Sequence, residues 1–374
     1  DSAEKLLLNA HKLAVNLLVN ELLDKGWTFI FTCRQNSQAE VDKYLKSKLT
    51  ISAQSINVPQ ITKDELYKFA GSYDIALPPN ERLLERLTNL FYLARYVELN
   101  IIDATRLTLQ SFRDEVWNQK VRGGEYGARG QYREDTMLAI IEDQVTNNRY
   151  FTPKQGLNHE AAYALVSDDV LSDNRLRGYS AKHDIYAEWA MDYILERKYE
   201  NANCEIPAFI NSVGETLAMV NTFARWFEAK IEESDDKIFD SVVDYLLNGI
   251  LSSRWQQAII KCICGSQIAA QPFFNKYKEE LVANDYAWLD KFISVMSVSG
   301  QTIEGYITLD GVSYPRMKPV GGGWEAAINI IYDYADAYYM KHLKYVFAVL
   351  DNYLRLRTKD TFVSKKAAML SLRV

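Results

Sequence analysis

The sequence predicts a mostly α-helical protein that begins with a small α/β piece. Three observations support this prediction. Apolar residues recur at helical spacing over most of the chain from about residue 61 onward. One short apolar run, Trp27–Thr32, is typical of a buried strand, and Ser55–Pro59 is the only other good strand candidate in the first hundred residues. A helix followed at once by a buried strand is typical of an α/β domain.

The composition indicates a globular protein of two or three domains. The chain has 374 residues, of which 48% are hydrophobic, and 43 basic against 49 acidic side chains give a net charge of −6. These values argue against intrinsic disorder and against a protein that coats nucleic acid. No apolar run approaches the ~20 residues of a membrane span, and no signal peptide is visible. Four cysteines do not make a disulfide scaffold, so we expect reduced thiols and a cytoplasmic location.

The first elements place an arginine where a ligand would bind. Leu6, Leu13 and Leu17 share one face of an opening helix, which Gly26 ends. Arg34 lies two residues beyond the predicted strand, and ligands bind at the carboxyl ends of strands in parallel sheets. A guanidinium there suits a phosphate. Spacing alone favours the alternative, a solvent-exposed arginine.

The next segment is helical and carries a clear start signal. Thr62 and Glu65 have the spacing of a capping box, in which each side chain bonds the backbone of the other. Pro78–Asn80 breaks the connection that follows. One apolar face then predicts a single helix over Leu83–Ala94.

Residues 106–200 predict a small winged-helix unit. Helices are expected over 134–146 and 160–171, a short strand or wing over Arg175–Tyr179, and a further helix from Ile185. The glycine-rich stretch Arg122–Gly130 has no lysine and no preceding strand, so we interpret it as a mobile surface loop rather than a phosphate loop.

Residues 205–374 are expected to be helical, and paired helices there could be degenerate solenoid units. The turn-rich segment Ser297–Gly323 interrupts them and predicts a hairpin around Asp310-Gly311. Gly321–Gly323 is interpreted as a flexible connection into a helix.

Common catalytic patterns are absent from the sequence. It contains no P-loop motif, no Gly-x-Ser-x-Gly elbow, and no two histidines within four residues of each other. Hydrolase and zinc-enzyme interpretations therefore lack support. His183-Asp184 at the start of a helix is of more interest, because a histidine there can face an anion. Without further context, a histidine paired with local backbone is the favoured alternative.

Taken together, these sequence motifs resemble the second half of a STAND-type P-loop NTPase, a signal-transducing relative of NACHT proteins. The stretch Asp1-Ser2-Ala3-Glu4 resembles the Walker B acids of that core. The predicted helix that follows and then Trp27–Arg34 resemble its next helix and its sensor strand. The resemblance implies that the chain starts at the Walker B acid and that the P-loop lies upstream. The roles that it implies are Mg²⁺ association for Asp1, orientation of water for Glu4, and sensing of the γ-phosphate for Thr32 and Arg34.

The resemblance continues in the same order along the chain. Ile56–Val58 and then Ile61–Leu66 resemble the family's strand and the capped first helix of its lid. Leu87–Leu93 resembles the Asn-Pro-Phe-x-Leu lid motif, although Leu90 stands where proline is usual. Tyr179–Trp189 resembles the winged-helix Phe-x-His-Asp string. This last match implies that His183 contacts the β-phosphate of ADP.

The resemblance also implies an organisation and a mechanism. In the mechanism that it implies, ADP holds a closed state, and a protein trigger acts through residues 201–374. ATP then replaces ADP, and the protein forms a homo-oligomer. The pattern of Pro319, Val320, Gly321 and Trp324 resembles segments of bacterial, antiviral-type members of the family. We expect ATP or ADP and Mg²⁺ as cofactors of the longer protein, no hydrolysis by this chain alone, and no membrane partner. The implied domains are residues 1–60 (part of the NTPase core), 61–105 (helical lid), 106–200 (winged helix) and 201–374 (α-helical region).

A second hypothesis is a helical scaffold whose winged-helix module binds protein or DNA without any nucleotide. A DNA-reading module should show a basic face. Here the mixture of charges favours a nucleotide-facing or protein-facing module, so nucleic acid is not an expected partner. The basic residues of the region are Arg175, Arg177 and Lys182, and the acidic ones are Asp168, Asp169, Asp173, Asp184 and Glu188.

Overall fold

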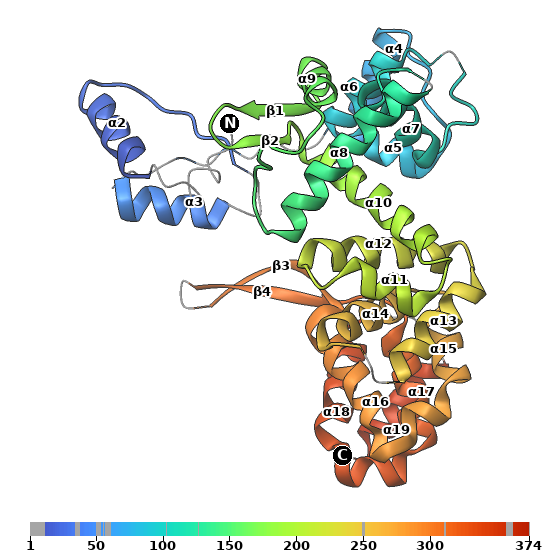
Figure 1. Cartoon of the computed structure of the whole chain (residues 1–374). Helices are drawn as coiled ribbons and strands as arrows, with labels where there is room; N and C mark the ends of the chain where they lie inside the picture. Colours follow the sequence, from blue (N-terminus) through green and yellow to red (C-terminus); the bar gives the residue numbers. More distant parts are fainter. Residues whose placement is uncertain are drawn as a thin grey trace. The chain divides into compact units, whose positions relative to one another are not determined.

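The computed structural model confirms that the chain is mostly α-helical, with two small antiparallel sheets among the described residues (Figure 1). The chain divides into two compact units, Asp1–Phe112 and Arg113–Val374, and each is described by itself. The structure describes residues 12–33, 38–49, 54, 56, 61–101, 103–125, 127–248, 251–309, 312–356 and 362–373.

The strand predicted at Trp27–Thr32 is wrong. Residues 27–33 are extended, but they pair with no other strand among the described residues. Phe29, Phe31 and Cys33 turn inward onto a small apolar cluster, whereas Ile30 is 92% exposed and Trp27 is 61% exposed. The sequence pattern fits a strand covered on both faces, and here only one face is covered. The neighbouring elements are α2 (Lys12–Asp24), α3 (Gln38–Tyr44) and the π-helical turn η2 (Leu45–Leu49).

The rest of the first unit is helical, and its start signal is confirmed. Thr62 and Glu65 form the predicted capping box at the start of α4. The single helix predicted over Leu83–Ala94 is instead two helices, because the side chain of Asn89 accepts a hydrogen bond from the N–H of Phe91 and starts a new one. The helices are α4 (Lys63–Ser72), α5 (Glu81–Leu87) and α6 (Leu90–Leu99).

The second unit opens with helices, a β-hairpin and another helix. The expected short strand or wing over Arg175–Tyr179 is a β-hairpin, in which Arg175–Arg177 forms the turn between two strands that pair from Leu171↔Ala181 to Asn174↔Gly178. The order of helices and hairpin is the expected one, and the winged-helix assignment stays a prediction. The elements are α7 (Leu109–Val116, which crosses the unit boundary), η3 (Trp117–Val121), α8 (Ala128–Thr146), α9 (His159–Ser167), β1 (Leu171–Asn174), β2 (Gly178–Ala181) and α10 (Asp184–Asn201).

The remaining helices extend this unit as a stack. Helix α10 packs on α12, α12 on α14, α14 on α16, and α16 on α18, while α15, α17 and α19 pack in a second row. Buried aromatic rings link neighbouring layers, as in the contacts of Phe223 with Trp255 and of Phe273 with Phe292. The helices are α11 (Ile206–Val213), α12 (Leu217–Glu232), α13 (Asp236–Leu247), α14 (Ser253–Gly265), α15 (Ala270–Lys276), α16 (Lys278–Ser299), α17 (Gly323–Asp333), α18 (Ala335–Leu356) and α19 (Phe362–Ser371).

The predicted second hairpin is present. Strand β3 (Gln301–Leu309) pairs antiparallel with β4 (Val312–Pro319), and the register is shifted once between Ile303 and Gly305. The expected turn residues, Asp310 and Gly311, lie outside the described residues. The hairpin projects from the helical stack in Figure 1.

The three glycines that follow this hairpin are not the flexible connection that we expected. Gly321 has φ of +92°, and a Cβ atom there would lie 2.4 Å from the carbonyl oxygen of Cys264. A Cβ atom on Gly323 would lie 2.5 Å from the sulfur of Met296. The glycines are therefore required because α14 and α16 pack directly against the backbone at the start of α17.

We predict that Gly321→Ala lowers the free energy of unfolding by about 2 kcal/mol or more, because alanine combines an unfavourable positive φ with a backbone clash. Thermal unfolding followed by circular dichroism measures the effect. The matched control is Gly265→Ala, where a Cβ atom meets nothing within 4 Å and φ is not positive. Equal melting temperatures for the two variants would contradict this account of the glycines.

Candidate functional site

Most residues of the predicted nucleotide site lie outside the part of the chain that the structure describes. Asp1, Glu4 and Arg34 are among these. Thr32 is described, and its side chain is exposed on the extended segment. The structure therefore does not test whether these four residues lie close together, and their assigned roles stay predictions. His183 is the candidate whose geometry can be analysed.

His183 is the N-cap residue of α10. Its backbone is extended, with φ of −132° and ψ of 140°, and its Nδ1 atom accepts a hydrogen bond from the N–H of Ile185 at 3.2 Å. In the neutral ring the proton is then on Nε2. The side chain is exposed and lies beside the positive end of an 18-residue helix.

The hairpin in front of His183 is fixed to the body of the unit. Tyr179 on β2 exchanges two backbone hydrogen bonds with Thr152, both of 2.9 Å, and its carbonyl also accepts from the side chain of Gln144 at 3.0 Å. A Cβ atom on Gly178 would lie 1.8 Å from the carbonyl oxygen of Thr152. This close approach, which only glycine permits, places the strand that leads to His183.

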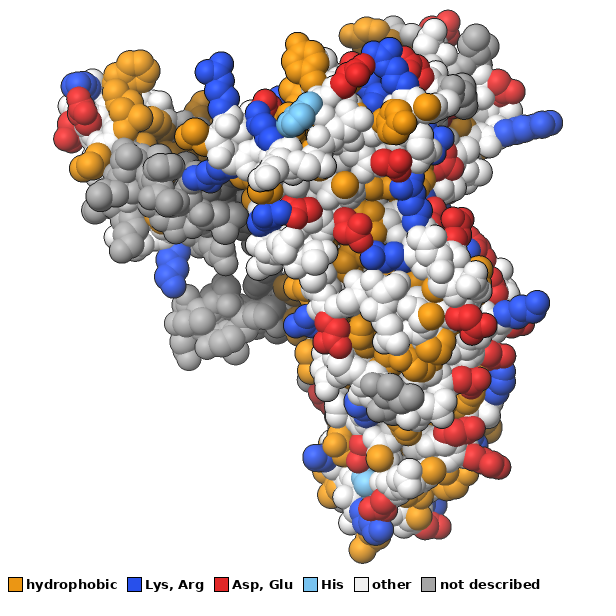
Figure 2. Space-filling view, viewed as in Figure 1, with side chains coloured by type: hydrophobic (Ala, Val, Ile, Leu, Met, Phe, Trp, Pro, Cys, Tyr) orange, Lys and Arg blue, Asp and Glu red, His pale blue; other side chains and the backbone are white. Residues whose placement is uncertain are grey.

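The charges near His183 are mixed. Lys182 lies 3.5 Å from Asp169, and Lys154 forms an ion pair of 2.6 Å with Asp173. Acidic and basic side chains alternate over the face of the molecule in Figure 2. Acidic and basic side chains thus lie next to each other on and beside this hairpin.

A buried carboxylate ties α8 to α10 and to the glycine-rich loop. The side chain of Glu134 is 3% exposed and accepts hydrogen bonds from the indole N–H of Trp117 at 2.7 Å, from Arg122 at 2.8 and 3.1 Å, and from Arg197 at 2.8 Å. The bond to this carboxylate raises the pKa of Arg122. Four charge-assisted bonds satisfy the buried oxygens, which an isolated carboxylate could not tolerate.

The glycine-rich stretch Arg122–Gly130 is therefore not the mobile loop that we expected. Arg122 is bound to Glu134, and buried Arg133 donates to the carbonyls of Lys120 and Val121, each at 2.8 Å. A Cβ atom on Gly130 would lie 2.2 Å from the carbonyl oxygen of Glu125. The described part of the loop is packed against α8, and no sequence motif signals the long-range partner Glu134.

A second polar cluster joins three helices at the middle of α10. Asp192 accepts from Arg113 of α7 at 3.0 Å and from Arg225 of α12 at 3.1 Å. The neighbouring Tyr193 donates to Asp114 at 2.7 Å, and burial followed by this bond raises the pKa of its hydroxyl. Burial also raises the pKa of Glu196 one turn on. Helix α10 is thus connected to the helices on both sides.

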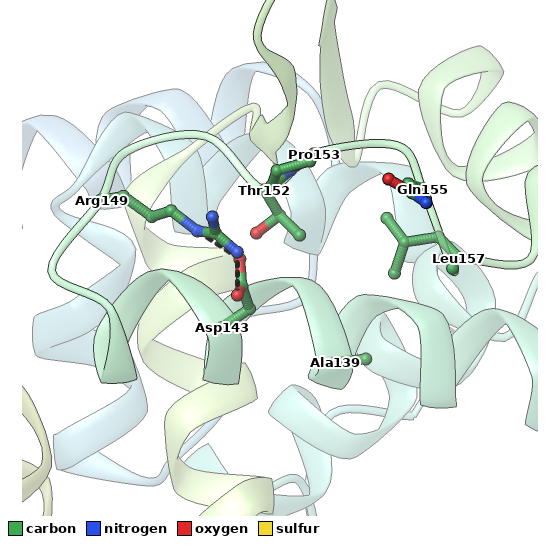
Figure 3. A pocket seen from close by; sticks show the side chains of 8 residues that line it. Ala139, Asp143, Arg149, Thr152, Pro153, Gln155 and Leu157 are labelled. Carbon is green, nitrogen blue, oxygen red and sulfur yellow. Dashed lines mark hydrogen bonds and ion pairs between the residues drawn. The ribbon is translucent and has the colours of Figure 1, made fainter.

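An open cavity of about 340 Å³ lies between α8 and the segment that precedes α9 (Figure 3). Its charged lining is the pair of Asp143 and Arg149, which form a two-bond ion pair. Partial burial raises the pKa of Asp143, but hydrogen bonds from Arg149, Thr152 and Asn147 outweigh this and hold it below its usual range. Because these polar groups already bind one another, the cavity offers little to orient a ligand.

The thiols and carboxylates do not form a metal site in the described residues. No group of three or more histidine, cysteine, aspartate or glutamate side chains is arranged there to hold an ion. Cys262 and Cys264 are buried, which raises the pKa of both thiols, and all four cysteines are free. No helix among the described residues is both long enough and apolar enough to cross a bilayer.

Comparison of the sequence with models of known protein families, and with curated proteins, found no match.

We predict that Glu134→Gln frees the glycine-rich loop and lowers the free energy of unfolding by about 3 kcal/mol, because two arginines lose their buried counter-charge. Limited trypsin digestion should then cleave rapidly after Arg122 and Arg129. The control is Asp135→Asn, since Asp135 is half exposed and its pairing with Arg197 should contribute less than about 1 kcal/mol. Cleavage that is as slow in Glu134→Gln as in the control would refute the anchoring role.

Proposed function

We propose that this chain is the switch and relay part of a nucleotide-regulated signalling NTPase of the STAND type. The observation that carries the proposal is the geometry of His183. Its ring is exposed at the positive end of a helix, its Nδ1 atom is held by the N–H of Ile185, and a fixed hairpin leads directly to it. This arrangement suits a phosphate, because a helix N-terminus and a neutral imidazole both donate to anions.

In the proposed switch, the Nε2–H group of His183 donates to the β-phosphate of ADP and stabilises a closed, inactive state. Exchange of ADP for ATP removes that contact. A ligand shifts a two-state equilibrium only through contacts that differ between the states, and this hydrogen bond is such a contact. The loss of one bond to a charged group is enough to change the ratio of states by about tenfold or more.

The extended segment before Arg34 supports the same proposal. Residues 28–32 have no backbone hydrogen bond among the described residues, and Ile30 is almost fully exposed. An extended segment with alternating burial and a free backbone can take its place in a larger sheet. In that setting Arg34 would contact the γ-phosphate, Asp1 would associate with Mg²⁺, and Glu4 would orient the attacking water.

Helix α10 is the element that would relay the state of the nucleotide. It begins beside His183, and nine residues later Asp192 binds Arg113 of α7 and Arg225 of α12. Helix α12 is the next layer of the stack that ends with α18. A protein trigger acting on residues 201–374 could thus bias the same helix, and release of the closed state would permit homo-oligomerisation. We propose a cytoplasmic location, and defence signalling as in antiviral members of the family.

The second candidate is a helical scaffold without a nucleotide role. The stack of helices favours it, since layered helices offer long surfaces to protein partners. In this case the N–H of His183 would face solvent or a protein carboxylate. The two candidates differ in whether the purified protein retains a nucleotide.

We predict that the protein expressed from its full-length gene copurifies with ADP, and that His183→Ala retains about tenfold less, because the phosphate loses a hydrogen-bond donor. The measurement is denaturation of the purified protein followed by chromatography of the released small molecules.

The matched control is His159→Ala, which removes another exposed histidine from the start of a helix of the same unit. It should retain as much ADP as the wild type. A well-folded wild type that carries no nucleotide would favour the scaffold, and equal ADP in the wild type and His183→Ala would exclude the proposed contact.

A further inference from the structure

Helices α16 and α18 are each interrupted, and the interruptions lie against each other. In α16 the backbone leaves the helix at Ala283, and the next three residues, Asn284, Asp285 and Tyr286, are left-handed, with φ of 52°, 55° and 62°. In α18 the helix breaks at His342, with φ of −119° and ψ of 26°. Three consecutive left-handed residues without glycine are rare, and they persist only where surrounding contacts hold them.

The contacts that hold this left-handed turn come from α18. The ring of Tyr286 lies edge-on to Tyr338 and to His342, with centroids 4.9 and 5.3 Å apart. The carboxylate of Asp285 accepts from the ammonium group of Lys341 at 2.9 Å. The turn is therefore dependent on the residues that flank the break in the neighbouring helix.

His342 lies at the centre of these contacts. Its side chain is 10% exposed and its ring stacks on Tyr338 with centroids 4.7 Å apart. Nδ1 lies 2.8 Å from one carboxylate oxygen of Asp290, whose other oxygen accepts from the hydroxyl of Tyr338 at 2.6 Å. Nε2 is buried without a hydrogen-bond partner and lies 3.8 Å from the carboxylate of Asp285.

This arrangement distinguishes between the protonation states of the ring. In a neutral imidazole one nitrogen carries the proton, so the lone pair of the other faces a carboxylate. In the imidazolium both nitrogens are donors, and each faces a carboxylate, Asp290 on one side and Asp285 on the other. Only the charged ring can attract both carboxylates at once, and Asp285 belongs to the left-handed turn.

Two of the groups that face the ring, Asp285 and Tyr338, keep one charge state near neutral pH. Lys341 donates to Asp285 and, together with the nearby His342, holds the pKa of that carboxyl below its usual range. Burial and the bond to Asp290 raise the pKa of Tyr338, which stays neutral. Within the described residues, no group of α19 or β4 has a recorded contact with the ring. The groups that face it are Asp285, Tyr286 and Asp290 of α16, Lys341, Tyr338 and Tyr345 of α18, and, through Tyr286, Tyr334 at the end of α17.

We propose that His342 is a pH-sensitive latch on α16. When the ring is protonated, Nε2–H attracts Asp285 and the turn over Asn284–Tyr286 is held in its left-handed form. Loss of the proton removes that attraction, and the segment relaxes toward a continuous helix. The two conformations differ in the direction of the first turns of α16, so titration of one side chain changes the packing of α16 in the stack. This inference does not depend on the proposed nucleotide switch.

Hydrogen exchange of the full chain, read by mass spectrometry, tests the latch. Exchange in peptides covering residues 283–290, corrected for the intrinsic effect of pH, should be faster at about pH 8 than at about pH 6 by about threefold or more, because the attraction between the charged ring and Asp285 is lost. Peptides of α12 should show no such change. His342→Gln should abolish the pH response, and His159→Gln, which removes an exposed histidine, should keep it.

Asp285→Asn provides a second test that does not alter the buried ring, since Asp285 is 59% exposed. It removes the carboxylate that the protonated ring attracts, so the pH response should shrink strongly. Equal corrected exchange of the wild type at both pH values would overturn the proposal. A full pH response in His342→Gln or in Asp285→Asn would also overturn it.

Discussion

The buried carboxylate of Glu134 is the interaction on which the arrangement of the second unit depends. It receives bonds from η3, from the glycine-rich loop and from α10, so one side chain of α8 fixes three other segments. Such a cluster contributes little net stability relative to apolar residues of the same shape, but removal of one partner costs about 3–5 kcal/mol. The main effect of the cluster is therefore to select one packing arrangement of these segments. It sets the position of α10 on α8, and with it the direction in which His183 faces.

Two of the polar clusters of the second unit, around Glu134 and around His342, differ in character. Both carboxylate oxygens of Glu134 have donors, and the backbones of α8 and α10 are regular helices there. Around His342 one ring nitrogen lacks a partner, and both neighbouring helices are broken. A saturated cluster resists change, whereas an unsaturated one next to strained backbone can respond to a proton. The saturated cluster lies at α8 and α10, at the beginning of the stack, and the unsaturated one lies at α16 and α18, at its end.

The sequence predicted the features that depend on local pattern. The helical periods, the capping box at Thr62 and the hairpin around residues 301–319 are confirmed, because each is determined by residues close in the chain.

The strand at Trp27–Thr32 was wrong because a strand needs a neighbour that the pattern cannot supply. The helix over Leu83–Ala94 was split by Asn89, whose cap competes with a continuous apolar face. Both glycine-rich stretches were misjudged, since glycine permits either freedom or close approach and only the contacts distinguish them.

The candidate site was predictable in part for the same reason. The position of His183 at the start of a helix followed from local pattern, and its ring geometry did not. The hydrogen-bond partners of the Glu134 carboxylate and of the His342 ring lie between 12 and 63 residues away in the chain, so no spacing in one sequence could reveal them.

The most direct test of the central claim is an experimental structure of the protein from its complete gene with ADP bound. The account predicts that Nε2 of His183 lies within about 3 Å of an oxygen of the terminal phosphate, the distance of an N–H···O hydrogen bond. A structure in which the phosphates are bound by other groups while His183 faces solvent would contradict it.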